Sequence, residues 1–113
     1  MQAACNMANG ANGTTGVTTA TLSPGADKLA HLAGFAVSAR ATGATDVTLT
    51  VTGVVGGPLT ADVDVGAGTA VARTVINFDP PLPATAKGVD ITVSLAAVGA
   101  GGVTTVWAWG VKE

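Results

Sequence analysis

Few residues of this chain are of a type that carries out chemistry, and their spacing assembles no catalytic site. The 113 residues include one histidine, His31, and one cysteine, Cys5. A nucleophilic serine needs an activating base, and no serine of the chain lies in a recognisable nucleophile motif. One Cys and one His also fall short of the ligands of a structural zinc site. We predict that the protein is not an enzyme and has no catalytic, cofactor-binding or metal-binding residues, with His31 on the face or rim of a strand.

An Asp-Val-Asp segment at 62–64 begins like a calcium-binding loop. The EF-hand pattern closes with a glutamate at position 12, which is Arg73 here. The alternation instead predicts a strand with Ala61, Val63 and Val65 inward and the two aspartates in solvent. A weak calcium site of another type stays open as an alternative, because carboxylates suit this ion.

Trp107 and Trp109 are the large aromatic residues that lie close together in the sequence. Two positions apart on a strand, they share one face. They are candidates for a protein-interface anchor or a sugar-stacking platform, and the structural alternative is that they fill the core. We favour a core or interface-core role, because the chain has only two Phe and no Tyr. Sugar binding calls for neighbouring hydrogen-bonding side chains, and Thr105 and Lys112 offer few.

Charge is sparse and mixed, which excludes one large class of partner. Five basic residues against seven acidic ones give a net charge of −2. The basic residues are dispersed and form no phosphate-binding stripe, so we expect no nucleic-acid partner. No apolar run reaches the ~18 residues of a membrane-spanning helix, and we expect no membrane partner.

Short apolar-polar alternations between Gly and Pro turns indicate an all-β chain. Strands are predicted at 17–22, 29–40, 47–51, 59–65, 69–78, 89–95 and 103–111. The segment 29–40 has partly helical spacing, but Gly34, Phe35 and Val37 favour a strand. Residues 79–83, Asp-Pro-Pro-Leu-Pro, are predicted to form a stiff loop, since proline cannot donate to a ladder. The expected fold is an antiparallel β-sandwich, jelly-roll-like, with seven to eight strands.

The first 16 residues are predicted to form an extended N-terminal arm ahead of a β-sandwich domain over 17–113. Asn-Gly pairs and the absence of charge or periodicity give the arm little reason to fold alone. We expect either a mobile terminus or an arm held by a partner. Asn6, Met7 and Asn9 are therefore candidate partner contacts, together with Trp107 and Trp109.

Several segments resemble small virion proteins of tailed bacteriophages, a group with β-sandwich or jelly-roll folds. The resemblance lies in residues 32–39 (LAGFAVSA), 46–53 (DVTLTVTG), 76–83 (INFDPPLP) and 91–97 (ITVSLAA), followed by glycine-rich 99–102 and the strand 106–111. It covers residues 17–111 in layout and composition, and leaves the arm outside. Some members are head decoration, or cement, proteins that clamp neighbouring capsomers, and the group has no catalytic residues to carry over.

The resemblance implies a structural protein on the outer surface of a phage capsid, made in the host cytoplasm. Its partner would be the major capsid protein or another virion protein. A homo-oligomer such as a trimer, or contacts with lattice neighbours, is expected. A monomer bound at each capsomer is the alternative. The alternatives are a low-copy tail, collar or fibre-base protein and, from another class, a carbohydrate- or surface-binding β-sandwich module.

Overall fold

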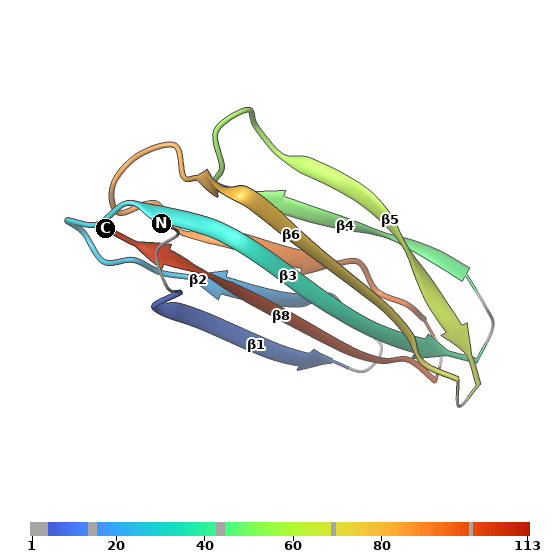
Figure 1. Cartoon of the computed structure of the whole chain (residues 1–113). Coiled ribbons are helices and arrows are strands. Elements are labelled where there is room, and N and C mark those ends of the chain that lie inside the picture. The colour runs from blue at the N-terminus through green and yellow to red at the C-terminus, as the bar shows by residue number, and fades with distance from the viewer. Residues whose placement is uncertain (1–4, 14–15, 43–44, 69, 100) are drawn as a thin grey trace.

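The computed structural model describes residues 5–13, 16–42, 45–68, 70–99 and 101–113. Within these residues the chain forms eight strands (Figure 1), which confirms the predicted all-β class and strand number. The strands are β1 (Met7–Gly13), β2 (Thr18–Leu22), β3 (Ala30–Ala41), β4 (Thr45–Thr52), β5 (Leu59–Ala67), β6 (Ala72–Pro83), β7 (Ile91–Leu95) and β8 (Val103–Lys112). The segment that also had helical spacing is the strand β3.

The strands pair as two sheets in the order of a jelly roll. One sheet runs β1-β8-β3-β6 and the other runs β2-β7-β4-β5, and every neighbouring pair within them is antiparallel. Each sheet therefore takes its strands alternately from the two halves of the chain. This order is the double Greek key that defines the eight-stranded jelly roll, which confirms the predicted architecture.

The two sheets contact each other at both edges, and they separate along part of the β5–β6 edge. The end of β5 pairs in parallel with the end of β3, at Arg40 with Gly66 and Ala41 with Ala67. The hydroxyls of Thr18 and Thr104 form a buried 2.6 Å hydrogen bond between β2 and β8. Between β5 and β6 the core opens into an apolar cavity of about 170 Å³. Its lining comes from β3, β4, β5 and β6: Phe35, Leu49, Val51, Leu59, Thr60, Ala61, Ile76 and Phe78.

The core consists mainly of aliphatic side chains that alternate along the strands. Leu49 and Val51 on β4 and Ile91, Val93 and Leu95 on β7 are at most 2% exposed. Their polar neighbours face outward, as expected for half-buried strands. On β5 the predicted directions are also correct, with Val63 and Val65 buried and both aspartates exposed.

Residues 7–13 of the predicted arm form β1 and pair with β8 throughout, from Met7 opposite Gly110 to Gly13 opposite Thr104. Asparagine side chains help to fix this edge strand. Asn6 accepts a 2.7 Å hydrogen bond from the backbone nitrogen of Lys112, and Asn9 accepts one of 3.1 Å from that of Thr21. Backbone pairing and these polar bonds hold a segment that lacks the alternation of a strand. This part of the arm therefore lies in the sheet.

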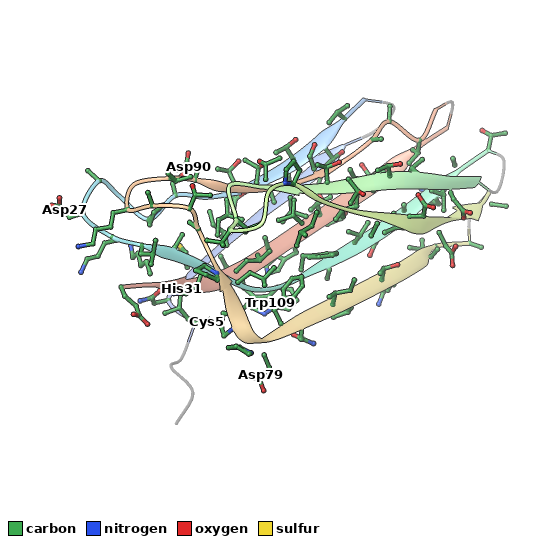
Figure 2. All side chains as sticks on the ribbon, turned by 90° about the horizontal axis from the view of Figure 1, so that it is seen from above. Cys5, Asp27, His31, Asp79, Asp90 and Trp109 are labelled. Carbon is green, nitrogen blue, oxygen red and sulfur yellow. The ribbon has the colours of Figure 1, made fainter. Side chains whose placement is uncertain are left out.

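The proline-rich segment 79–83 is part of β6, so the prediction of a loop there was wrong. Leu82 and Pro83 pair with β3 opposite Leu32 and His31, whereas Asn77 pairs with Gly34. Residues 78–81 thus stand opposite Ala33 alone, and Pro80 and Pro81 occupy a bulge where no ladder donor is required. Figure 2 shows β6 bending sharply beside Asp79.

Replacing Gly110 with alanine tests the packing of β8 against β3. A Cβ at Gly110 would lie 2.1 Å from the backbone oxygen of His31, so the two strands would have to separate. We expect Gly110→Ala to reduce the free energy of unfolding by about 1–3 kcal/mol in chemical denaturation. Gly16→Ala is the matched control, because a Cβ there meets nothing within 4 Å. Equal stability of the two variants would contradict this packing.

Candidate functional site

The outer face of the β1-β8-β3-β6 sheet carries both tryptophans, and we call it the tryptophan face. Its side chains form three rows across the strands in the order β1, β8, β3 and β6. The rows are Ala8-Trp109-Gly34-Asn77, Gly10-Trp107-Ala36-Val75 and Asn12-Thr105-Ser38-Arg73. Trp107 is 50% exposed, and Trp109 is half-buried. Neither side chain belongs to the core cluster, so the favoured role as core residues is wrong, and the interface-core role stays a prediction.

Glycines on the neighbouring strands make room for the two indole rings. A Cβ at Gly10 would lie 2.2 Å from Cε3 of Trp107, and a Cβ at Gly34 would lie 2.7 Å from Cζ2 of Trp109. The ring of Trp107 therefore lies over β1, and that of Trp109 lies over β3. Ala8 and Ala36, which flank Trp109 and Trp107 on the side opposite these glycines, are also small. Because these neighbours have short side chains or none, the Trp107 ring is accessible on an apolar surface.

A row of polar side chains borders Trp107 on the same face. The hydroxyl of Thr105 donates a 2.9 Å hydrogen bond to Oδ1 of Asn12, which leaves the Asn12 amide nitrogen as a donor. Ser38 and Arg73 continue the row on β3 and β6. Consecutive rows on one face are about 7 Å apart along the strands. The structure thus brings hydrogen-bonding groups from four strands beside one exposed indole.

Sequence reasoning missed this row. Asn12, Ser38 and Arg73 lie far apart in the chain, and only the register of β1, β3 and β6 against β8 brings them to Thr105. One sequence feature could have indicated part of this row. Trp107 and Thr105 are two positions apart, so they lie on the same face of one strand. Lys112, the other polar neighbour considered, lies at the far end of β8.

The predicted contacts in the first residues are engaged within the chain. Asn6 bonds the backbone of Lys112 through both side-chain atoms, at 2.7 and 3.1 Å. Met7 packs against the core, and Asn9 bonds the backbone of β2. Among the predicted contact residues, Trp107 is thus the one with a large exposed apolar surface.

The ends of β1, β3, β5 and β7 and the beginnings of the strands that follow them gather at one end of the sandwich, which we call the loop end (Figure 1). Gly68 in the β5–β6 connection donates a 2.7 Å hydrogen bond to the backbone oxygen of Ala41. The residues between these strands, 14–17, 42–44, 68–71 and 96–102, include no Asp, Glu, Lys or Arg. Val17 and Val71 there are 65% and 49% exposed. The connections at the opposite end and the C-terminus contain Asp27, Lys28, Lys87, Asp90 and Glu113, and Figure 2 labels two of them.

The outer face of the β2-β7-β4-β5 sheet is covered by hydroxyl groups. One row across its four strands is Thr19-Ser94-Thr50-Thr60. Thr19 and Ser94 form a 2.9 Å hydrogen bond, and the hydroxyls of Thr52 and Thr92 bond each other. These cross-strand pairs stabilise the sheet.

Two carboxylates meet on the same outer face. Asp46 on β4 stands directly opposite Asp64 on β5, and both are exposed. A hydrogen bond and charge repulsion from Asp64 raise the pKa of Asp46 above its ordinary value of 3.8, with a smaller contribution from Asp62. Like charges directly opposite each other weaken a strand pair.

His31 and Cys5 are the other residues whose types could carry chemistry. His31 is half-buried on β3, and its Nδ1 has no hydrogen-bond partner among the described residues. Cys5 is exposed and unpaired with another cysteine. Within the described ranges, no three residues of the His, Cys, Asp and Glu types are grouped to hold a metal ion. The described part of the chain also contains no helix that is long and apolar enough to cross a membrane.

Known proteins resemble this chain in structure and not in sequence. No family model and no curated protein matches it. TmCBM61, solved in complex with β-1,4-galactotriose, matches with 15% identity and a TM-score of 0.45, covering 88% of this chain and 68% of that one. The virus-like particle of the extra small virus of the giant freshwater prawn Macrobrachium rosenbergii matches with 16% identity and a TM-score of 0.41, covering 95% and 79%. The jelly roll thus resembles a carbohydrate-binding module and a virus capsid protein in the arrangement of its strands.

Removal of the exposed indole tests its position outside the core. Trp107→Ala should lower the free energy of unfolding by about 1–2 kcal/mol, well below the 3–5 kcal/mol of a fully buried tryptophan. Trp109→Ala should cost more, because Trp109 is less exposed and lies over Gly34. Urea denaturation measures both values. Unfolding of the Trp107→Ala variant would place this residue in the core.

Removal of one carboxylate tests the acidic pair. Because the pKa of Asp46 is higher in the folded chain than in the unfolded chain, the folded state binds more protons, and stability falls as pH rises from about 3.8. Asp64→Asn should raise the melting temperature at pH 7 and flatten this pH dependence. Asp27→Asn, a change to an exposed aspartate in the β2–β3 connection, is the control. Equal pH profiles for Asp64→Asn and the unmodified chain would contradict the coupling.

Proposed function

We propose that this protein is a structural, non-enzymatic component of a bacteriophage virion that binds the outer surface of the capsid and stabilises the contacts between capsomers. The observation that carries this proposal is the loop end, where four uncharged connections expose Val17 and Val71. The resemblance of residues 17–111 to small virion proteins supports the same class of function. Its site of action would be the capsid surface, after synthesis in the host cytoplasm.

The chemistry of the loop end fits a docking surface. The central part of a protein interface is depleted in charged residues, because each buried charge must be desolvated. Glycine and alanine in these connections allow close approach of a partner's backbone. The charged connections lie at the other end of the sandwich, where they stay in solvent. We therefore infer that the domain binds its partner through the loop end.

Binding in many copies explains how a modest contact stabilises a shell. A protein that binds the assembled capsid and not the loose subunits shifts the equilibrium towards the assembled state. A contact to two neighbouring capsomers adds avidity without a large interface. The partner is the major capsid protein, with other copies of this chain as lattice neighbours in a homo-oligomer. A tail, collar or fibre-base protein in few copies is the alternative within the virion.

Charge introduced at the loop end tests the docking surface. Val17→Asp and Val71→Asp should each weaken binding to capsids lacking this protein by about tenfold or more, because an uncompensated charge enters the interface. Val55→Asp is the matched control, since Val55 is 59% exposed in the β4–β5 connection at the opposite end. Co-sedimentation with purified capsids measures the binding.

The stability of each variant is measured alongside, since all three valines are exposed and their replacement should leave the fold intact. Loss of capsid binding in Val55→Asp alone would move the docking surface to the opposite end. Full binding by all three variants would contradict docking through either end.

A further inference from the structure

We propose that the tryptophan face binds a saccharide, with a pyranose ring stacked on Trp107 and its hydroxyl groups bonded by the row Asn12-Thr105-Ser38-Arg73. This site goes beyond the proposed structural role. It lies on the outer side of the β1-β8-β3-β6 sheet, with the polar row next to the loop end and Trp107 two residues further from that end along β8, whereas the proposed docking surface is the loop end itself. A copy attached by the loop end would leave Trp107 accessible.

The exposed indole supplies the apolar half of the site. A pyranose presents a face of C–H groups, which packs favourably against the electron-rich face of an aromatic ring. Trp107 is 50% exposed, and its ring lies over Gly10 on the edge strand β1. Gly10 and Ala36 flank it in its row, so no bulky neighbour blocks the ring.

The polar row supplies the directional half of the site. Asn12 and Ser38 lie on either side of Thr105, one strand away in each direction, which is about 4.8 Å. The row is displaced from Trp107 by about 7 Å along the strands, so a sugar on the indole brings its ring substituents over it. Asn12 retains its amide nitrogen as a donor, and the Thr105 hydroxyl can accept a hydrogen bond. Arg73 adds guanidinium donors at the β6 end.

The composition of the face selects a saccharide over a protein partner. A protein interface of this size would centre on a cluster of large apolar side chains, whereas the exposed apolar side chains in the row of Trp107 are this indole and Val75 at the β6 end, separated by Ala36. The row contains no carboxylate, and Arg73 is its sole charged member. Neutral donors and acceptors beside an aromatic ring match a ligand with many hydroxyl groups. Because the polar groups already stand on paired strands, little ordering is required on binding.

The test is binding of the full chain to an array of immobilised oligosaccharides covering hexoses, N-acetylhexosamines, deoxyhexoses and uronic acids. We expect binding to at least one class and a change of tryptophan fluorescence when the same oligosaccharide is titrated in solution. Trp107→Ala and Asn12→Ala should each weaken that binding by about tenfold or more, and Trp107→Phe should retain part of it. Val55→Thr, at a distant exposed site, is the control.

Gly10→Ala tests whether saccharide binding depends on the position of the Trp107 ring as well as on its presence. The added Cβ would displace the Trp107 ring while leaving the residue in place, so saccharide binding should fall while the chain stays folded, with a loss of stability no greater than that of Trp107→Ala. An array without any bound saccharide, or binding that Trp107→Ala leaves unchanged, would overturn the proposal. Loss of capsid binding in Trp107→Ala with an empty array would instead make this face a protein interface.

The capsid-binding proposal and the saccharide-binding proposal can be contradicted independently of each other. Val17→Asp should lose capsid binding and keep saccharide binding, and Trp107→Ala should do the reverse. Loss of both activities in one folded variant would contradict the separation of the two surfaces.

Discussion

The backbone ladder between β3 and β8 is the interaction on which the rest of the structure depends. It joins Ala30–Arg40 to Val103–Lys112 at the centre of one sheet, with a single irregularity at Ala33. β1 is added on one side of this pair and β6 on the other. The ladder places Val106 and Ala108 in the core and Trp107 and Trp109 on the opposite face. A shift of one residue would exchange these two sets.

Small side chains shape both the interior and the surfaces of this protein. The core is mainly aliphatic, with Phe35 as a buried aromatic side chain, and it leaves an opening between β5 and β6 where the two sheets separate. On the outside, the same preference for small residues lets the indoles of Trp107 and Trp109 lie over glycines. Charge is confined largely to one end and to parts of the outer faces. The molecule thus has one end whose connections contain no charged residue, although Arg40 on β3 bonds the backbone oxygen of Gly68 there. It also has an opposite end with charged connections and one face with an accessible aromatic ring.

The sequence was informative where one physical signal dominated. Alternation identified β4, β5 and β7 and the directions of their side chains, and turn residues separated the strands. It was insufficient for β1, because Asn-Gly pairs carry no apolar alternation and the strand is held by backbone pairing and asparagine side chains. It was also insufficient for residues 79–83, since a bulge that tolerates proline depends on β3. The polar row beside Trp107 depends on register across four strands, which no local pattern reveals.

The copy number of the chain in purified virions tests the central claim most directly. Quantitative mass spectrometry of the particles gives the ratio of this chain to the major capsid protein. Our account predicts about one copy for every one to three capsid subunits, because a lattice protein repeats with its lattice. Roughly a dozen copies per particle would contradict a capsid role and indicate the neck, tail or fibre base. Absence from the particles would contradict the virion assignment altogether.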